Sequence, residues 1–380
     1  MFFEPIDDSP RNRQLPIQQN FHLVKNNVTS NFLIFGANGY TGELTARFAV
    51  ERGLHPVLAG RNAAELEALA NRLDLEHRIF GLDETEVMDH ALSGVDAVLH
   101  CAGPFLHTHR QMAAACLRTA THYLDITGEI AVYSALSDMD VEAKDKGVML
   151  LPGIGFDVVP TDCLAAHLKR RLPTASHLAL AFRSIGPAQI SRGTGKTFVE
   201  GLGHSGYVRK DRVMTPVPHL SKSRVIDFGD GPIEVTRMTW GDVFTAYHST
   251  GIPNIENYFV PSSMVRSLLK MSRHLRPVMS WDPVQRVLKR NIAAGPPGPT
   301  DAERERTHTV VWGEVKDDQE NTATSRLRGP EGYTFTVLAS LAAIQRVILG
   351  EAPAGYQTPS SAYGADFVLE IEGVDREDVN

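Results

Sequence analysis

A glycine-rich turn between an apolar run and an amphipathic segment constrains the fold of this chain more than any other feature. The run Phe32–Phe35 is apolar, and Gly36, Gly39 and Gly42 follow at intervals of three; a helix is expected over 43–52. The first glycine permits a tight turn, a later one lets the helix pack closely on the strand, and the helix N-terminus presents unpaired N–H groups. This strand–turn–helix context predicts the first βα unit of a dinucleotide-binding fold, with the turn around the phosphates.

The same alternation of short apolar runs and amphipathic stretches continues to about residue 153. Further strands are expected at 56–60, 77–80, 96–101, 122–126 and 148–151, with helices at 63–73 and 110–120. Strands that alternate with helices form βαβ units with right-handed crossovers. The sequence therefore predicts an α/β fold, a Rossmann-type doubly wound parallel sheet with helices on both faces.

The pattern changes after Asp157. A helix is expected over 161–171, strands at 178–182, 225–228, 233–240 and 309–312, and a final helix over 336–349. Longer strands with period-two alternation favour a mostly antiparallel sheet with one covered face. The proline- and glycine-rich stretch 295–306 is expected to be a loop or a mobile tip, and the polar residues 1–30 an N-terminal arm.

Charge and composition exclude several classes of partner. The 380 residues carry a formal net charge of −7 without a basic run, which argues against nucleic acid as the main partner. The apolar stretch 333–349 is interrupted by Gln345 and Arg346 and is short for a membrane span, so a buried helix is expected. The three cysteines match no zinc spacing and are expected to be buried thiols in a reducing cytoplasm. We therefore expect a small-molecule substrate, and the sequence leaves open whether the chain forms a homodimer.

The residue after the second expected strand indicates which dinucleotide binds. NAD sites usually place an Asp or Glu here to accept hydrogen bonds from the ribose hydroxyls, whereas this chain has Gly60 followed by Arg61. A guanidinium pairs with a 2′-phosphate, which a carboxylate would repel. We therefore expect NADP(H) as the cofactor. The alternative, that Arg61 is a solvated residue in the first turn of the next helix, stays open.

A second cofactor contact is expected after the fourth strand. Ala102, Gly103 and Pro104 follow that strand at the carboxyl edge, beside the point where the strand order reverses. Small residues there allow the backbone to approach the nicotinamide. The alternative is a simple turn that ends the strand.

Candidate proton donors follow at the same edge. His107 and His109 begin a helix, where positions two apart diverge, so no metal site is expected and either histidine is a candidate acid. Asp125 ends the fifth strand and is a candidate orienting group, although Thr127 and Glu129 equally suit helix capping. The segment Gly193–Thr197 resembles a phosphate loop but has Ile190 where that motif needs glycine, which excludes a nucleotide triphosphatase.

Several motifs together resemble the saccharopine dehydrogenase-like NADP-binding oxidoreductases, which include trans-acting enoyl reductases. The resemblance covers roughly residues 31–375. The matching segments are Gly36–Gly42, Ala59–Arg61, Ala102–Phe105, Thr121–Glu129, Gly155–Pro160, Trp240–Tyr247, Tyr356–Pro359 and Ala362–Gly364. Relatives often carry Tyr-Gly where this chain has Thr108 and His109, so a catalytic tyrosine is not expected at that place in this chain.

The resemblance implies the domain order and the activity. It implies an NADP-binding domain at 31–158, a substrate-binding α+β domain at 159–330, and a C-terminal helix and tail at 331–380 that return to the first domain. It also implies an NADPH-dependent reductase of a C=C bond in an acyl or ketide-type substrate. A saccharopine-type amino-acid dehydrogenase and a non-catalytic NADP-binding sensor remain alternatives.

The residues expected to act in that reaction fall into two groups. The pyrophosphate is expected to contact Gly36, Asn38, Gly39, Tyr40, Thr41 and Gly42. The candidate catalytic or substrate-orienting side chains are His107, His109, Asp125 and Tyr247.

Overall fold

The computed structural model describes residues 31–187, 189–201, 205–218, 220–261, 265–267, 278 and 281–380. The expected N-terminal arm, residues 1–30, lies outside this part of the chain.

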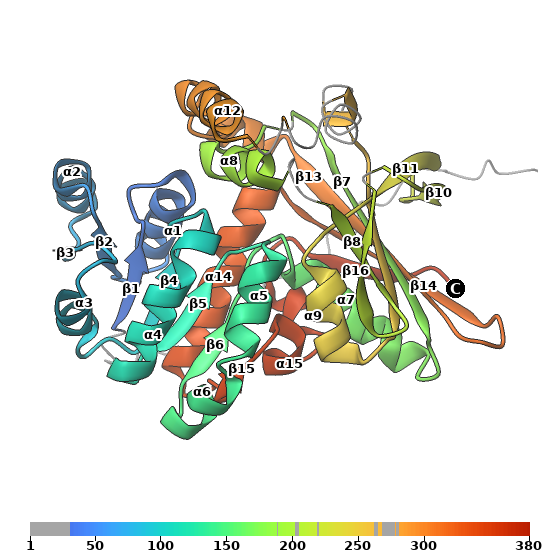
Figure 1. The fold of residues 1–380 in the computed structure, drawn as a ribbon, viewed down its shortest axis with the longest axis horizontal. Helices are drawn as coiled ribbons and strands as arrows, with labels where there is room; N and C mark the ends of the chain where they lie inside the picture. Colours follow the sequence, from blue (N-terminus) through green and yellow to red (C-terminus); the bar gives the residue numbers. More distant parts are fainter. Residues whose placement is uncertain are drawn as a thin grey trace, which may run out of the picture.

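The first sheet is parallel and has the strand order β15-β6-β5-β4-β1-β2-β3, shown on the left of Figure 1. Its strands are β1 (Phe32–Phe35), β2 (Val57–Gly60), β3 (His77–Ile79), β4 (Ala97–His100), β5 (His122–Asp125), β6 (Met149–Leu151) and β15 (Gly355–Tyr356). The order reverses between β1 and β4, which is the switch point of a Rossmann-type sheet. The predicted doubly wound parallel sheet is confirmed, and the six strands expected before residue 153 match within a residue or two at their ends.

Helices cover both faces of this sheet. They are α1 (Tyr40–Glu51), α2 (Ala63–Leu73), α3 (Thr85–Leu92), the 3₁₀ turn η1 (Phe105–His107), α4 (His109–Thr119), α5 (Ile130–Ser137) and α6 (Asp140–Lys146). One buried cluster includes Leu44 of α1, and the other includes Met112 of α4. Strands β1, β2 and β4 between them are buried on both faces, which explains their mostly apolar sequences.

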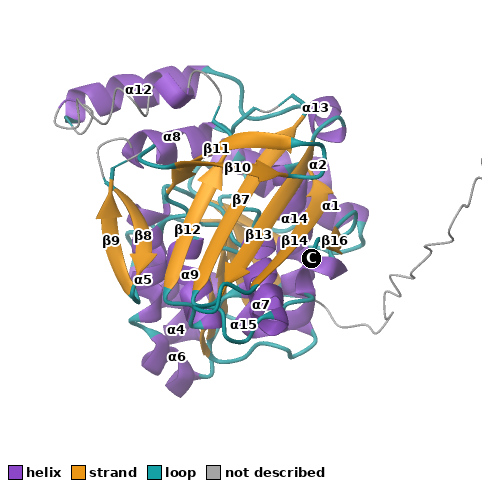
Figure 2. Cartoon of the chain, turned by 90° about the vertical axis from the view of Figure 1, so that its right-hand side faces the viewer, coloured by secondary structure: helices purple, strands orange, loops and turns teal. Residues whose placement is uncertain are grey.

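The second sheet is mixed, with the order β10-β11-β12-β7-β13-β14-β16, and β8 and β9 attached through β12. Its strands are β7 (His177–Ile185), β8 (Gly206–Lys210), β9 (Val213–Val217), β10 (Ser223–Asp227), β11 (Pro232–Met238), β12 (Asn254–Phe259), β13 (His308–Lys316), β14 (Thr322–Pro330) and β16 (Asp375–Asp378). Every described pair is antiparallel except β7 with β12. Figure 2 shows this sheet face-on, and the mostly antiparallel prediction is confirmed.

The remaining helices lie between the two sheets or at their upper end in Figure 1. They are α7 (Val159–Arg171), α8 (Arg192–Gly201), α9 (Asp242–Thr250), α12 (Asp282–Ala294), α13 (Asp301–Glu305), α14 (Gly332–Ile348), α15 (Pro359–Tyr363) and the 3₁₀ turn η2 (Phe367–Glu370). Helix α14 packs against α1 and β4 of the first sheet and against β14 of the second. The predicted return of the C-terminal helix to the first sheet is thus confirmed, and one apolar cluster runs through Leu44, Leu341 and Leu180.

The prediction for residues 295–306 was wrong in part: residues 295–300 form a loop, but residues 301–305 form α13. Thr300 and Glu303 form a reciprocal capping box that starts α13. The hydroxyl of Tyr40 donates to the Pro299 carbonyl at 2.6 Å, and Arg47 pairs with Asp301 at 2.9 Å. The loop motif was recognised, but the capping residues and the long-range partners that hold it in place were not. The segment Gly193–Thr197, which resembles a phosphate loop, lies in the first turns of α8.

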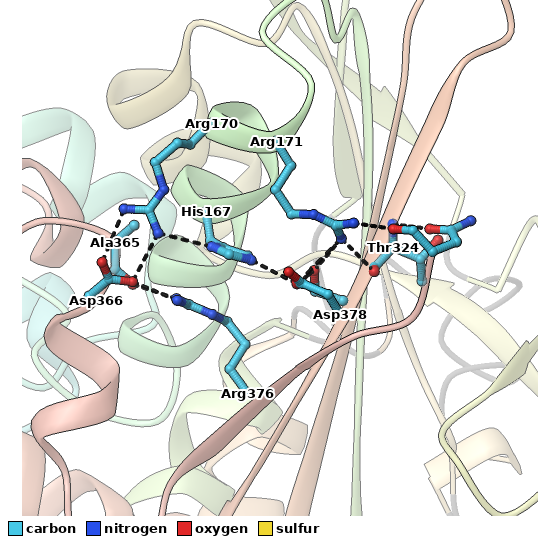
Figure 3. A network of polar contacts seen from close by, with 10 residues as sticks. His167, Arg170, Arg171, Thr324, Ala365, Asp366, Arg376 and Asp378 are labelled. Carbon is cyan, nitrogen blue, oxygen red and sulfur yellow. Dashed lines mark hydrogen bonds and ion pairs between the residues drawn. The ribbon is translucent and has the colours of Figure 1, made fainter.

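A charged network ties the C-terminal strand to α7 (Figure 3). His167 contacts Asp378 at 2.8 Å, and Arg170 and Arg376 both bond to Asp366, at 3.0 and 2.6 Å. The two guanidinium groups hold the pKa of the Asp366 carboxyl well below its usual range. Because Asp366 is about half exposed, solvent screening keeps each pair weak, and the network chiefly fixes where β16 ends.

Among the helices described, none combines the length and the apolar composition needed to cross a membrane.

Candidate functional site

Four neighbouring strands bring the predicted cofactor residues to one edge of the first sheet. In the strand register, Phe35 of β1 lies level with Ala59 of β2 and His100 of β4, and His100 lies level with Asp125 of β5. The residues that follow these positions therefore leave the sheet side by side at its carboxyl edge. This is where open parallel sheets bind ligands.

The turn after β1 has the shape that a phosphate requires. Gly36 has φ of +82°, a conformation that favours glycine, and its N–H donates to the Ala59 carbonyl at 2.8 Å. A Cβ at Gly42 would lie 2.3 Å from the Gly36 oxygen, so only glycine lets α1 pack this closely. Gly39 is exposed and caps the N-terminus of α1, whose first N–H groups have no partner within the helix. An anion at this place would be held by backbone donors and the helix dipole.

Gly36 and Ala102 bring the turns after β1 and β4 into contact. A Cβ at Gly36 would come within 2.9 Å of both the Cβ and the backbone nitrogen of Ala102. Gly103 is exposed and is joined to Pro104 by a cis peptide bond. The sequence-predicted contacts for the pyrophosphate and the nicotinamide therefore lie next to each other at the switch point.

The side chains of the turn after β1 face different neighbours. The Asn38 amide donates to Glu65 at 2.7 Å, and its oxygen lies over Gly60. The Tyr40 side chain points to the Pro299 carbonyl and to Arg304, whose guanidinium donates to the Tyr40 hydroxyl at 3.1 Å. Burial raises the pKa of Tyr40 to about 12. These contacts leave the backbone of the turn, rather than the Tyr40 hydroxyl, to meet an anion.

Arg61 follows β2 directly and is exposed. Within the described parts of the chain, its guanidinium makes no hydrogen bond or ion pair. A free cation one strand away from the phosphate turn suits a 2′-phosphate on the adenosine ribose. The geometry therefore fits NADP(H), with the glycine turn for the pyrophosphate and Arg61 for the additional phosphate.

The turn after β4 is fixed by a carboxylate from the segment that follows the next strand, β5. Glu129 accepts from the backbone N–H of Phe105 at 2.8 Å and of Leu106 at 2.9 Å, one bond to each oxygen. The Thr108 hydroxyl donates to the Ala102 carbonyl at 2.9 Å and lies 2.9 Å from His100 Nε2. Sequence reasoning had considered Glu129 as a helix cap; its contacts instead position the turn that carries Ala102–Pro104.

The two candidate histidines lie in different surroundings. His107 is exposed and its Nε2 lies 3.5 Å from Glu200 of α8, which also pairs with Lys289 of α12 at 2.6 Å. His109 is buried, and its Nδ1 lies 2.7 Å from the Phe105 carbonyl. Burial lowers the pKa of His109 and favours its neutral form. The structure therefore brings His107, but not His109, to the solvent-facing side of this turn.

Asp125 is buried, and both its oxygens accept hydrogen bonds. The Tyr123 hydroxyl donates to one oxygen at 2.6 Å, and the backbone N–H groups of Thr127 and Gly153 donate to the other at 2.9 and 3.0 Å. Burial raises the pKa of Asp125 to about 6. These bonds join the ends of β5 and β6, which is a positioning role.

Tyr247 lies on α9, away from the turns just described. The Arg209 guanidinium stacks on its ring at 4.1 Å, and Arg209 also donates to the Val243 carbonyl at 2.7 Å. The structure does not bring Tyr247 together with the histidines or with Asp125 through any recorded contact.

A surface depression of about 510 Å³ lies at the far end of α14 from the glycine turn. Its lining includes Arg346, Glu351 and Tyr363, and none of the predicted site residues. In the described residues, no group of three or more His, Cys, Asp or Glu side chains is arranged to hold a metal ion.

The fold and this edge define a Rossmann-type protein that binds a dinucleotide. Residues 32–151 match the family model described as the saccharopine dehydrogenase NADP-binding domain. Residues 32–151 are therefore similar to the NADP-binding domains of the saccharopine dehydrogenase class.

Curated relatives agree with this class. The trans-acting enoyl reductase of Mycobacterium ulcerans is 27% identical over 183 residues, which cover 45% of this chain and 44% of that protein. The human saccharopine dehydrogenase-like oxidoreductase is 25% identical over 228 residues, or 53% and 51% of the two chains. This chain thus spans about half the length of the curated relatives it matches.

The fold has a solved counterpart. The apo saccharopine dehydrogenase (L-Glu forming) of Saccharomyces cerevisiae superposes with a TM-score of 0.66, covering 92% of this chain and 100% of that one. At 12% identity this similarity concerns the fold alone.

Proposed function

We propose that this chain is an NADPH-dependent reductase that acts on a C=C bond conjugated to an acyl group. The observation that carries the proposal is the contact between the turns after β1 and β4, at Gly36 and Ala102, with the free Arg61 one strand away. Bound NADPH supplies the hydride. The glycine turn holds the pyrophosphate, and Ala102–Pro104 present a small surface, with Gly103 exposed, to the nicotinamide end.

The choice of substrate class has two supports. One is the similarity to a trans-acting enoyl reductase. The other concerns the main rival, a saccharopine-type dehydrogenase, whose dicarboxylic substrates need several converging cations. Of the two arginines available for that role, Arg192 is tied to the Gly295 carbonyl at 2.6 Å, while Arg110 is exposed on α4. One uncommitted arginine favours an acyl substrate over an amino dicarboxylate.

Turnover assays separate the candidates. We expect the protein to oxidise NADPH with the N-acetylcysteamine thioester of crotonic acid as substrate. Reduction of NADP⁺ by saccharopine instead would transfer the assignment to the amino-acid dehydrogenases. NADPH binding with no turnover of either probe would favour the sensor alternative.

The Arg61 assignment predicts the cofactor preference. The wild-type protein should bind NADPH at least about tenfold more tightly than NADH, because a charge-assisted contact to phosphate contributes about 1.5–3 kcal/mol. Arg61→Ala should remove most of that preference and leave NADH binding unchanged. Isothermal titration with both cofactors measures the effect, and Arg110→Ala serves as a matched control on an exposed arginine. Equal affinities in the wild-type protein would refute the role of Arg61.

A further inference from the structure

The loop after β6 reaches the same edge of the sheet as the cofactor turns. Its backbone is tied to the end of β5, since the Ile154 N–H donates to the Asp125 carbonyl at 2.8 Å. Two further hydrogen bonds hold this loop, one from the segment between β11 and α9 and one to α14. The Trp240 indole donates to the Asp157 carbonyl at 2.5 Å, and the Phe156 N–H donates to the Thr336 hydroxyl at 3.0 Å. The main chain at residues 156 and 157 is therefore fixed by the segment between β11 and α9 and by α14.

The Asp157 carboxylate lies against the loop that follows β5. A Cβ at Gly128 would come within 2.7 Å of Asp157 Oδ2, so the absence of a side chain at Gly128 makes room for this oxygen. The neighbouring residue is Glu129, which fixes the turn that carries Ala102–Pro104. Asp157 therefore lies against Gly128, the residue that precedes Glu129, and Glu129 positions the expected nicotinamide contact.

The Asp157 carboxylate differs from the other two carboxylates at this edge, because neither of its oxygens accepts a hydrogen bond from a described residue. Both oxygens of Asp125 and both of Glu129 accept hydrogen bonds. The Asp157 side chain is half-buried and makes no hydrogen bond or ion pair with any described residue. A carboxylate that is removed from water without a partner is unfavourable unless it has a task or a ligand.

The surroundings favour the protonated form of Asp157 at neutral pH. Burial and the nearby Glu129 raise the pKa of Asp157 to about 7. The other ionisable groups that face it are Tyr133 of α5 and Tyr333 of α14, whose pKa values are raised by burial. An acid with this pKa is matched to proton transfer near neutral pH.

We propose that Asp157 is the proton donor at the nicotinamide end of this site, and this rests on the proposed reductase function. The hydride from NADPH and its electron pair go to the β-carbon of the conjugated C=C bond. The proton of the Asp157 carboxyl goes to the α-carbon, and the π bond becomes two C–H bonds. The Asp157 carboxylate then takes a proton from water, so that one NADPH and one proton are consumed for each bond reduced.

Cofactor binding tests the placement of Asp157 without any substrate. The ionised carboxylate should stabilise the positive ring of NADP⁺ relative to neutral NADPH. As the pH rises from 6 to 8, the affinity for NADP⁺ should therefore increase relative to the affinity for NADPH by on the order of fivefold. The 2′-phosphate also titrates in this range, but it is common to both forms and cancels in the ratio. Asp157→Asn should make the ratio independent of pH.

Three further variants make the binding test specific. Asp145→Asn, which removes an exposed carboxylate on α6, should behave as the wild type. Asp157→Glu should keep the pH dependence, and thermal melts check that each variant is folded. If the pH dependence survives in Asp157→Asn and disappears in Glu129→Gln, the assignment to Asp157 is overturned.

Turnover provides the second readout. With the crotonyl thioester, Asp157→Asn should lower kcat at least about 100-fold, within the 10²–10⁴-fold range of general acid catalysis, while the Kd for NADPH changes less than about threefold. In the wild type, kcat should fall as pH rises through about 7. Full turnover in Asp157→Asn would refute the role as acid. If no probe is turned over but the binding ratio still responds to Asp157, the reductase assignment fails while the placement of Asp157 stands.

Discussion

Gly39→Val should abolish measurable NADPH binding and leave the protein folded. Gly39 has φ of −80° and ψ of 161°, which any residue adopts, so the backbone itself does not require glycine there. A Cβ would lie 3.2 Å from the Gly36 carbonyl, and the branched side chain would occupy the space in front of the α1 N-terminus. We expect the NADPH dissociation constant to rise at least about 100-fold, because the phosphate loses its backbone donors.

Stability should change little, since replacing glycine by valine at an N-cap costs about 1 kcal/mol. Fluorescence titration with NADPH and a thermal melt measure the two effects. Gly201→Ala provides the control, because Gly201 lies at the end of α8 with open space around its Cβ direction. NADPH binding that is unchanged in Gly39→Val would show that the phosphates lie elsewhere.

Asp125→Ala should destabilise the fold by about 3–5 kcal/mol, because it leaves the Tyr123 hydroxyl and two buried N–H groups, of Thr127 and Gly153, without an acceptor. Asp125→Asn should be much milder. Its amide oxygen still accepts two of these bonds, and its NH₂ group donates to the Tyr123 oxygen.

The pH dependence distinguishes these variants. The pKa of Asp125 is about 6 in the folded protein and about 3.9 when unfolded, so the folded state binds the proton more tightly. The stability that this provides is complete below about pH 4 and is lost as pH rises through about 6. Relative to Asp125→Asn, the wild type should therefore lose about 2–3 kcal/mol between pH 4 and pH 7. Urea unfolding of both proteins at the two pH values gives this difference, and a constant difference would mean that Asp125 is not buried as described.

The first sheet was predictable because its strands are buried on both faces and end at punctuating residues. The runs that end at Gly36 and Gly60 are apolar throughout, and that pattern also fixes the edge at which the site lies. The cofactor preference followed from a single position, Arg61, since the chemistry of a 2′-phosphate admits a cation and excludes a carboxylate.

Strand β14 was not predicted, because Thr322–Pro330 contains few apolar residues. It forms because it pairs with β13 along nine positions in a hairpin, and its own residue pattern does not reveal this partner. The partners of the proposed acid were hidden in the same way. Asp157 was visible only as part of a family motif, whereas its room beside Gly128 and its support from Trp240 depend on contacts between distant segments.

Transfer of isotope from NADPH to a conjugated thioester would show whether this protein reduces a C=C bond. The protein is incubated with NADPH deuterated on both hydrogens of C4 and with the crotonyl thioester in ordinary water, and the product is analysed by mass spectrometry and NMR. We expect a saturated thioester with one deuterium on the β-carbon and a solvent-derived proton on the α-carbon. A product without deuterium, or no product from a protein that binds NADPH tightly, would contradict this expectation.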